Sequence, residues 1–236
     1  MTEKKQALIL AGGLGTRLRS VVNDRPKPMA LVEGKPFLEY VLNGLKNNGI
    51  TSIIFAVGYK GSMVEEYFGD GSRLGMQIVY SYEEGQLGTA GAIKNAVDKI
   101  STEAFYVLNG DTYYEIDYGK LAELNRKNNS IMTLVLREVE DISRYGKATL
   151  QDEQLIGFNE KSTEAIPGTI NGGIYYMKKE LLDRIPEGKV SLENEIIPML
   201  LAEGQSISGT INDGYFIDIG IPEDYFRFQE HVRKEL

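Results

Sequence analysis

The first half of the chain alternates short apolar runs with stretches whose apolar residues recur at helical spacing. The apolar runs suit buried strands, and the intervening stretches repeat apolar residues every three or four positions. The predicted strands span residues 7–10, 52–57, 77–81 and 105–108, and the predicted helices span residues 37–48, 63–68 and 91–100. Such alternation predicts an α/β fold in which a mainly parallel sheet is flanked by helices on both faces.

The second half of the chain is richer in strand patterns. Its predicted strands span residues 131–137, 147–150, 154–158 and 174–177, and its predicted helices span residues 192–201 and 223–234. No Pro/Ser-rich linker, internal repeat or low-complexity tract divides the chain. We therefore expect a single domain over residues 1–236, built on one mixed sheet.

Three glycines, Gly12, Gly13 and Gly15, follow the first predicted strand. Glycines at a strand end let backbone amides approach a flat base or a phosphate, because no side chain stands between them. Arg17 and Lys27 then supply fixed positive charge, which suits a triphosphate whose charge shifts during transfer. The segment lacks the spacing of the dinucleotide fingerprint and of the phosphate loop. A glycine turn chosen only for its tight geometry is the alternative interpretation.

Composition and charge remove several classes of function. The chain has no cysteine, which excludes disulfides and thiolate metal sites and agrees with a cytoplasmic protein. A net charge of −8 argues against nucleic acid as a partner, and no segment is long and apolar enough to span a membrane. The one histidine, His231, leaves histidine catalysis almost without support. Residues 12–36 are nevertheless locally basic, which is typical of a site for a small anion.

Two aspartates follow or interrupt apolar strands. Asp111 comes after the predicted strand 105–108 and a glycine, and Asp218 lies between Ile217 and Ile219. An acidic residue inside an apolar strand is costly unless it is paired. Mg²⁺ takes oxygen ligands, commonly one or two carboxylates together with substrate phosphates. The two aspartates therefore predict a magnesium site, and the alternative for either alone is an ion pair with a nearby lysine.

Four segments together resemble the signature of the sugar-nucleotide pyrophosphorylases, which join a sugar 1-phosphate to a nucleoside triphosphate and release pyrophosphate. The segments are LAGGLGTRL at 10–18, PKPMA at 26–30, GKPFL at 34–38 and GYFIDIG at 214–220. The resemblance covers nearly the whole chain and is strongest to the D-glycero-α-D-manno-heptose 1-phosphate guanylyltransferases. It implies the Rossmann-like nucleotide-diphospho-sugar transferase fold. Residues 1 to about 130 would bind the nucleotide, and residues from about 131 to 236 would bind the sugar.

The resemblance also implies roles for single residues. Arg17 would hold the leaving pyrophosphate and Lys27 the α-phosphate. Asp111 and Asp218 would hold Mg²⁺. The implied nucleotide-binding residues are Leu10, Ala11, Gly12, Gly13, Gly15, Thr16, Gly88, Thr89, Gly91 and Asn109. The implied sugar-phosphate-binding residues are Tyr145, Gly146, Glu160, Lys161, Asn171 and Gly172.

The implied reaction is in-line attack by a phosphate oxygen of the sugar 1-phosphate on the α-phosphorus of the triphosphate. That oxygen is already anionic, so positioning and charge neutralisation suffice without a general base. Thymidylyl-type relatives have glutamine where this chain has Gly91, and the smaller residue is predicted to leave room for a purine. The resemblance and the small Gly91 together favour GTP, and the resemblance implies the manno-heptose 1-phosphate as the acceptor.

Alternatives to that function stay open. Mannose, glucose or N-acetylmuramate 1-phosphate could replace the heptose as the acceptor. The alternative from another class is a non-catalytic nucleotide-sensing module, which would be expected to have lost Asp111, Asp218 or Lys27, and this chain has all three. A homodimer is compatible with the sequence but is not specified by it.

Overall fold

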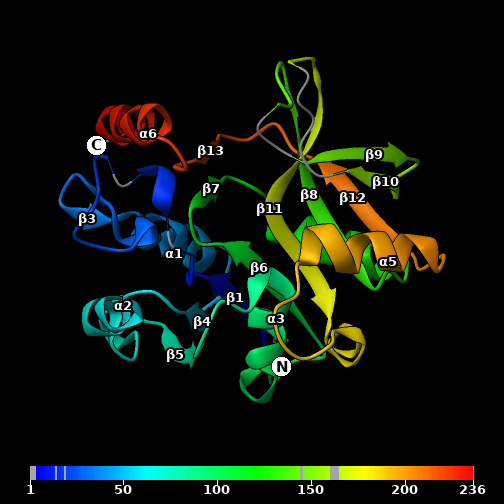
Figure 1. Ribbon diagram of the computed structural model, residues 1–236, viewed down its shortest axis with the longest axis horizontal. Helices are drawn as coiled ribbons and strands as arrows, with labels where there is room; N and C mark the ends of the chain where they lie inside the picture. The colour runs from blue at the N-terminus through cyan, green and yellow to red at the C-terminus, as the bar shows by residue number, and fades with distance from the viewer. Residues whose placement is uncertain (1–3, 14, 19, 144–145, 160–164, 236) are drawn as a thin grey trace.

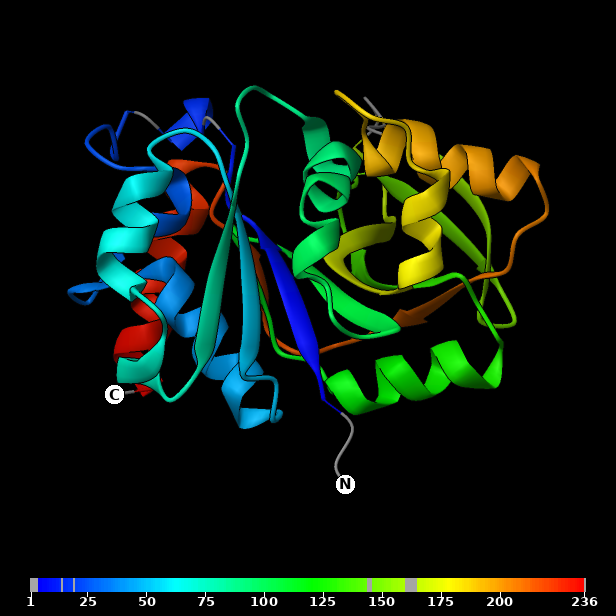
Figure 2. The ribbon, with the colours of Figure 1, turned by 90° about the horizontal axis from the view of Figure 1, so that it is seen from below.

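The computed structural model describes residues 4–13, 15–18, 20–143, 146–159 and 165–235, and for Thr16 it describes the backbone only. These residues form a mixed sheet of nine strands with helices on both faces (Figures 1 and 2). The strand order is β5-β4-β1-β6-β11-β8-β12-β10-β9. Within the described part of the chain, no helix is long and apolar enough to cross a membrane.

One half of the sheet is parallel. Its strands are β1 (Gln6–Leu10), β4 (Ser52–Val57), β5 (Gln77–Tyr82) and β6 (Ala104–Asn109). β1 pairs in parallel with β4 and β6, and β4 pairs in parallel with β5. β1, β4 and β6 are covered on both faces, which explains why their sequences are continuous apolar runs without alternation. Because these strands are parallel, their carboxyl ends meet at one edge.

The other half of the sheet begins at β11 (Gly168–Lys178), which pairs antiparallel with β6 and with β8 (Met132–Val139). β12 (Ile207–Ile211) is parallel to β8, and β10 (Gln154–Asn159) and β9 (Lys147–Gln151) complete the sheet. The predicted mixed sheet is confirmed. β6 and β11 are adjacent strands, so one continuous sheet carries both halves of the chain.

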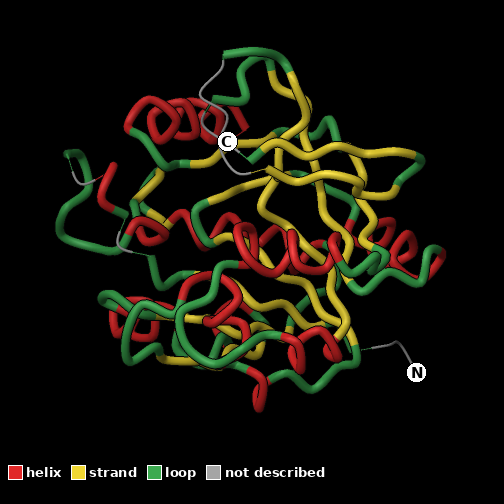
Figure 3. The backbone as a smooth tube through the Cα atoms, turned by 45° about the vertical axis from the view of Figure 1, so that its right-hand side comes forward, coloured by secondary structure: helices red, strands yellow, loops and turns green. Residues whose placement is uncertain are grey.

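Helices cover the sheet in two layers, seen edge-on in Figure 2 and as red tubes around yellow strands in Figure 3. On one face α1 (Phe37–Asn47), α2 (Gly61–Phe68), α4 (Tyr118–Lys127) and α6 (Pro222–Glu235) bury apolar residues in a shared core. On the other face α3 (Gly88–Asn95) and α5 (Ile197–Ala202) form a second core. Short 3-10 helices span Thr16–Leu18, Lys27–Met29, Ser72–Leu74, Val97–Lys99 and Lys179–Arg184, and a π-helix spans Leu192–Ile196.

Two short strand pairs lie outside the main sheet. β2 (Leu31–Val32) pairs with β3 (Lys35–Pro36), and β7 (Thr112–Tyr114) pairs antiparallel with β13 (Phe216–Asp218). Strands of two or three residues are too short to show a periodic pattern, so none of the four was predicted. The β7–β13 pair nevertheless builds the site, because it brings the 218 region to the carboxyl end of β6.

Most predicted elements are present with small shifts at their ends. Two predicted helices differ more. The predicted helix 91–100 begins at Gly88 in the structure, ends at Asn95 and continues only as a 3-10 turn, and the predicted helix 192–201 begins as a π-helix and becomes α-helical at Ile197. The sequence analysis also missed β12 and α4. α4 is mostly polar, and its start is marked by Asp117, whose side chain caps the backbone N–H groups of Gly119 and Lys120.

Candidate active site

The glycine segment and the Asn109–Asp111 turn lie side by side at the carboxyl edge of the parallel strands. Leu10 and Asn109 are partners in the β1–β6 register, and the Gly110 N–H donates to the Leu10 carbonyl at 2.9 Å. A Cβ on Gly110 would lie 2.6 Å from that carbonyl oxygen, so only glycine allows this approach. Asp111 is thereby presented next to the first glycine turn.

Asp218 reaches Asp111 through the β7–β13 pair. Asp218 is the register partner of Thr112, and the Ile219 N–H donates to the Asp111 carbonyl at 3.0 Å. Ile217 and Ile219 on either side are fully buried. The predicted juxtaposition of the two aspartates is therefore present, although they are far apart in sequence.

Lys27 lies between the two carboxylates. Its Nζ forms an ion pair with Asp111 Oδ2 and lies 3.5 Å from Asp218 Oδ1, and its side chain is only 9% exposed. The structure therefore contains the lysine pairing that was the alternative for each aspartate alone. Arg17 lines the same small cavity as Lys27 and Asp111, a space of 240 Å³ closed by Gly220.

The charges in this group perturb one another. Burial, and then the negative charge of Asp111, raise the pKa of Asp218, while Lys27 and Arg17 oppose the rise. Burial alone would lower the pKa of Lys27, but the two carboxylates outweigh it and the net pKa is raised. Two partly buried carboxylates with one interposed ammonium form a centre that gains from further positive charge.

This centre fits a magnesium ion by the chemistry of its donors. Both aspartates offer hard carboxylate oxygens, and Mg²⁺ characteristically takes one or two of these beside waters and phosphate oxygens. Among the described residues no cluster of three or more acidic, histidine or cysteine side chains could hold a metal ion by itself. A metal here would therefore complete its coordination shell with waters or with oxygens of a bound phosphate.

A cavity of 520 Å³ opens beside this centre and is lined by most of the predicted nucleotide-binding residues. These are Leu10, Gly12, Gly13, Gly15, Gly88, Thr89 and Asn109, with Asp111 at the border. The neighbouring cavity of 240 Å³ shares four of its lining residues. Ala11 does not line either space, because it is buried and its N–H donates to the Ala56 carbonyl.

Glu83 is a site residue that the sequence analysis missed. It follows β5 at the carboxyl edge, lines the larger cavity and accepts a hydrogen bond from the Leu87 N–H through Oε2 at 3.3 Å. Its Oε1 lies directly against Gly12, where a Cβ would collide with it. Burial raises the pKa of Glu83, and the bond from Leu87 opposes this. An acidic pair, Glu83 and Glu84, directly after a predicted parallel strand was the available signal.

The prediction that the small size of Gly91 leaves room for a purine is wrong. Gly91 does not line the nucleotide cavity, and a Cβ on it would collide with the Gly188 carbonyl oxygen. The N–H groups of Ala90 and Gly91 both donate to the Val190 carbonyl, at 3.0 and 3.2 Å, and are not free for a ligand. Glycine is needed here because the 188–190 backbone packs against the start of α3.

The predicted sugar side is described in part. Tyr145, Glu160 and Lys161 lie outside the described residues. Asn171 N–H donates to the Gly146 carbonyl at 3.2 Å, and a Cβ on Gly173 would lie 2.7 Å from Asn109 Nδ2. The irregular part of β11 at Asn171–Gly173 therefore contacts the nucleotide side directly.

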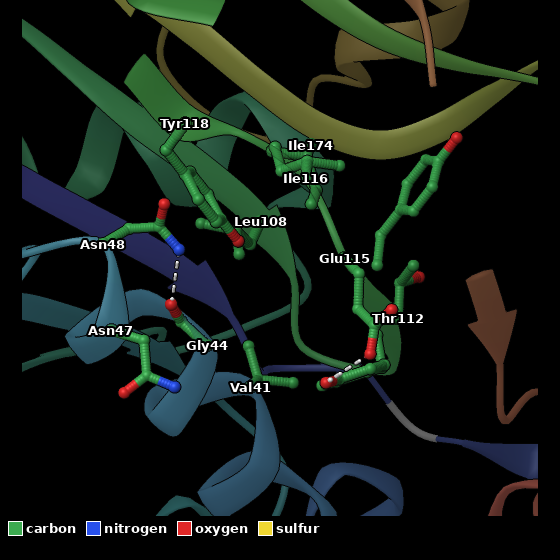
Figure 4. A pocket seen from close by; sticks show the side chains of 12 residues that line it. Val41, Gly44, Asn47, Asn48, Leu108, Thr112, Glu115, Ile116, Tyr118 and Ile174 are labelled. Carbon is green, nitrogen blue, oxygen red and sulfur yellow. Dashed lines mark hydrogen bonds between the residues drawn. The ribbon is translucent and has the colours of Figure 1, made fainter. Parts of the chain in front are cut away.

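Another cavity, of 240 Å³, lies between α1 and β7 and contains none of the predicted site residues (Figure 4). It is lined by apolar side chains, among them Val41, Leu108 and Ile174, and by the polar Asn48 and Glu115. The Asn48 amide is already bonded to the Gly44 carbonyl at 2.9 Å. None of the predicted chemistry is therefore assigned to this cavity.

Comparison with known proteins agrees with this geometry. A D-glycero-alpha-D-manno-heptose 1-phosphate guanylyltransferase of Campylobacter jejuni is 44% identical over 94% of this chain and 98% of its own length. A mannose-1-phosphate guanylyltransferase of Mycobacterium tuberculosis is 39% identical over 96% of this chain and 64% of its own length. The crystal structure of HddC from Yersinia pseudotuberculosis, complexed with GMP-PN, superposes with a TM-score of 0.85 and 37% identity, covering 97% of this chain and 99% of that one.

The family assignment follows from the length of these matches and from the site. The fold is that of the nucleotide-diphospho-sugar transferases, with the glycine turn, Lys27 and the two aspartates at the carboxyl edge of the sheet. The Nucleotidyl transferase family matches residues 6–235. The chain belongs to the nucleotidyl transferase family.

Proposed function

We propose that this enzyme transfers a guanylyl group from GTP to D-glycero-α-D-manno-heptose 1-phosphate, giving the GDP-heptose and pyrophosphate. The observation that best supports transfer chemistry is that Lys27 forms ion pairs with both Asp111 and Asp218 at the border of the glycine-lined cavity. A nucleotide-sensing module would have no use for two adjacent, partly buried carboxylates, which repel each other. The relatives that match over the full chain length support the same reaction.

The chain's own groups supply positioning and charge. A phosphate oxygen of the sugar 1-phosphate attacks the α-phosphorus, the bond from the α-phosphorus to the bridging oxygen breaks, and pyrophosphate leaves with that electron pair. Lys27 neutralises charge at the α-phosphate, and Arg17, on the wall of the same small cavity, holds the leaving pyrophosphate. Asp111 and Asp218 would hold Mg²⁺, which supplies further neutralisation of the triphosphate when bound.

Glu83 supports guanine as the base. Guanine presents two adjacent donors, N1–H and the 2-amino group, and a carboxylate accepts both. Adenine offers only its 6-amino group beside the N1 lone pair, and uracil or thymine offers only N3–H between two carbonyl oxygens, so neither edge gives a carboxylate two adjacent donors. Oε1 of Glu83 faces the glycine turn of the cavity, and no described lysine or arginine pairs with this side chain. A bound guanine edge would supply the missing donors.

We expect Glu83→Gln to lower kcat/KM for GTP by about 100-fold, because two hydrogen bonds to a charged acceptor are weakened. Inosine triphosphate lacks the 2-amino group, so the wild-type preference for GTP over ITP should shrink in the variant. Pyrophosphate release with GTP, ITP and ATP measures this. Glu84→Gln, at the exposed neighbouring residue, is the matched control and should change neither ratio. If the ratio of kcat/KM for GTP to that for ITP is unchanged in Glu83→Gln, Glu83 does not recognise the base.

The same residue makes the stability of the ligand-free protein depend on pH. A carboxyl whose pKa is raised on folding keeps its proton in a range where the unfolded chain has lost it, so its contribution to stability falls as pH rises through that range. Glu83→Gln removes this penalty. Relative to wild type, the variant should be more stable near pH 8 than near pH 5, as measured by chemical denaturation. A difference that is constant between the two pH values would contradict the assignment.

The sugar preference is tested by a panel. Nucleoside triphosphates crossed with heptose, mannose, glucose and N-acetylmuramate 1-phosphates, assayed by pyrophosphate release, should give the fastest turnover with GTP and the manno-heptose. Mannose 1-phosphate should be a slower substrate, because one exocyclic carbon is worth only about 1–3 kcal/mol in a pocket. Preference for UTP or TTP would overturn the guanylyl assignment while leaving nucleotidyl transfer in place.

A further inference from the structure

We infer that Glu193 is a positioning residue that holds the nucleotide side and the sugar side of the site in one alignment. The inference rests on the proposed transfer between two bound substrates, but not on the choice of GTP or of the heptose. Glu193 belongs to the π-helical turn Leu192–Ile196, was not predicted as a site residue, and lines neither of the two cavities at the active centre.

Three hydroxyl groups converge on the Glu193 carboxylate. Oε2 accepts from Thr89 Oγ1 at 2.6 Å and from Ser191 Oγ at 3.2 Å, and Oε1 accepts from the Tyr175 hydroxyl at 3.1 Å. Tyr175 is fully buried, and its hydroxyl in turn accepts from Asn171 Nδ2 at 2.6 Å. A continuous chain of hydrogen bonds therefore connects Asn171 on β11 with Thr89 at the start of α3.

Fixed donors at the far ends set the direction of every bond in this chain. The Gly173 N–H donates to Asn171 Oδ1 at 3.1 Å, which turns the Asn171 amide nitrogen toward Tyr175. The Leu192 N–H donates to Thr89 Oγ1 at 2.8 Å. Each hydroxyl has accepted a hydrogen bond and has its own proton left to donate. The group at their meeting point can use all three protons only by accepting, and the two oxygens of a carboxylate provide the acceptors.

Both ends of this chain of hydrogen bonds lie at or near the nucleotide cavity. Thr89 lines that cavity, and Asn171 begins the irregular part of β11 whose Gly173 packs against Asn109 of the cavity. Asn171 is also one of the residues expected to contact the sugar. In-line transfer depends on the relative position of the two substrates, and small displacements are costly even when they originate away from the reacting atoms. A shared acceptor between the two sides limits such displacement.

The chemistry of position 193 fits this role better than it fits stability alone. Among the residues that the structure describes, Glu193 has hydroxyl partners and no ion pair with a lysine or arginine. A partly buried carboxylate without a counter-ion is an expensive way to hold a turn together, because its desolvation opposes folding. The backbone bonds from Ala90 and Gly91 to Val190 already fasten that turn to α3.

Two substitutions test this chain of hydrogen bonds at different points. Tyr175→Phe keeps the ring and removes only the link between Asn171 and Glu193, so the KM for the sugar 1-phosphate should rise about tenfold while the KM for the triphosphate stays within about twofold. Glu193→Gln replaces one acceptor oxygen with an N–H₂ group, so at least one of the hydroxyl groups that donate to residue 193 loses its acceptor. This variant should lower kcat and raise the sugar KM by about tenfold or more. In the double variant the effects should not add, because both act on one chain of bonds.

Tyr106→Phe is the matched control. Tyr106 is a buried tyrosine on the neighbouring strand β6 whose hydroxyl donates to the Tyr118 carbonyl at 2.8 Å, and it lines neither cavity of the active centre. It should lower the unfolding temperature about as much as Tyr175→Phe and leave both KM values unchanged. Equal sugar KM values in the two variants, or additive effects in the double variant, would overturn the inference. If the wild type prefers another substrate pair, the same variants are assayed with that pair. A wrong choice of substrates is therefore distinguished from a wrong role for Glu193.

Discussion

Asp111→Asn and Asp218→Asn should each lower turnover by about 10²–10³-fold or more, measured as pyrophosphate release at saturating Mg²⁺. Each substitution removes a carboxylate oxygen from the centre that neutralises the triphosphate, while the side chain keeps its size. The fold should survive, because losing either charge relieves the repulsion that contributes to the raised pKa of Asp218. Thermal unfolding should therefore show little loss of stability for either variant.

The same substitution at a surface aspartate controls for nonspecific effects. Asp70 is exposed, and its side chain accepts the Ser72 N–H at 2.9 Å, which asparagine can also do. Asp70→Asn should retain full activity. Near wild-type turnover in Asp111→Asn or Asp218→Asn would show that the affected aspartate is not a metal ligand.

Lys27→Met should reduce kcat more than it raises the KM for the triphosphate. The charge at the α-phosphate grows as the new bond forms, so the ammonium stabilises the transition state more than the bound substrate. Steady-state kinetics over both substrates separates the two parameters. Lys35→Met, at a residue whose side chain is 56% exposed on the same basic segment, is the control and should keep both near wild type. An effect on KM alone would restrict Lys27 to docking the nucleotide.

Lys27→Met also has an expected effect on stability. It leaves Asp111 and Asp218 close together without their shared cation, which should cost about 1–3 kcal/mol, less than a fully buried pair because both carboxylates keep some solvent contact. Mg²⁺ alone should raise the unfolding temperature of the variant more than that of wild type, because lysine no longer competes for the same oxygens. An equal response of both proteins would argue against metal binding by this pair.

The sequence by itself determined the parallel half of the sheet and identified candidate residues for the transfer centre. Buried parallel strands such as β1, β4 and β6 are continuous apolar runs, and the helices between them repeat at helical spacing, so local pattern suffices. The glycine segment, Lys27 and the two aspartates were found for a similar reason. The glycines and aspartates stand out beside or within apolar segments, and Lys27 stands out as a positive charge in a locally basic segment of an acidic chain.

Only the tertiary structure decided which of these residues meet and what else surrounds the substrates. Asp218 reaches Asp111 through strands too short to carry a pattern, and Lys27 turned out to lie between them. The reason for Gly91 is a backbone that lies far away in the sequence. Glu83 and Glu193 look like ordinary acidic residues in sequence. Their roles depend on burial and on hydrogen-bond partners from distant elements, and such long-range contacts leave no periodic trace in the chain.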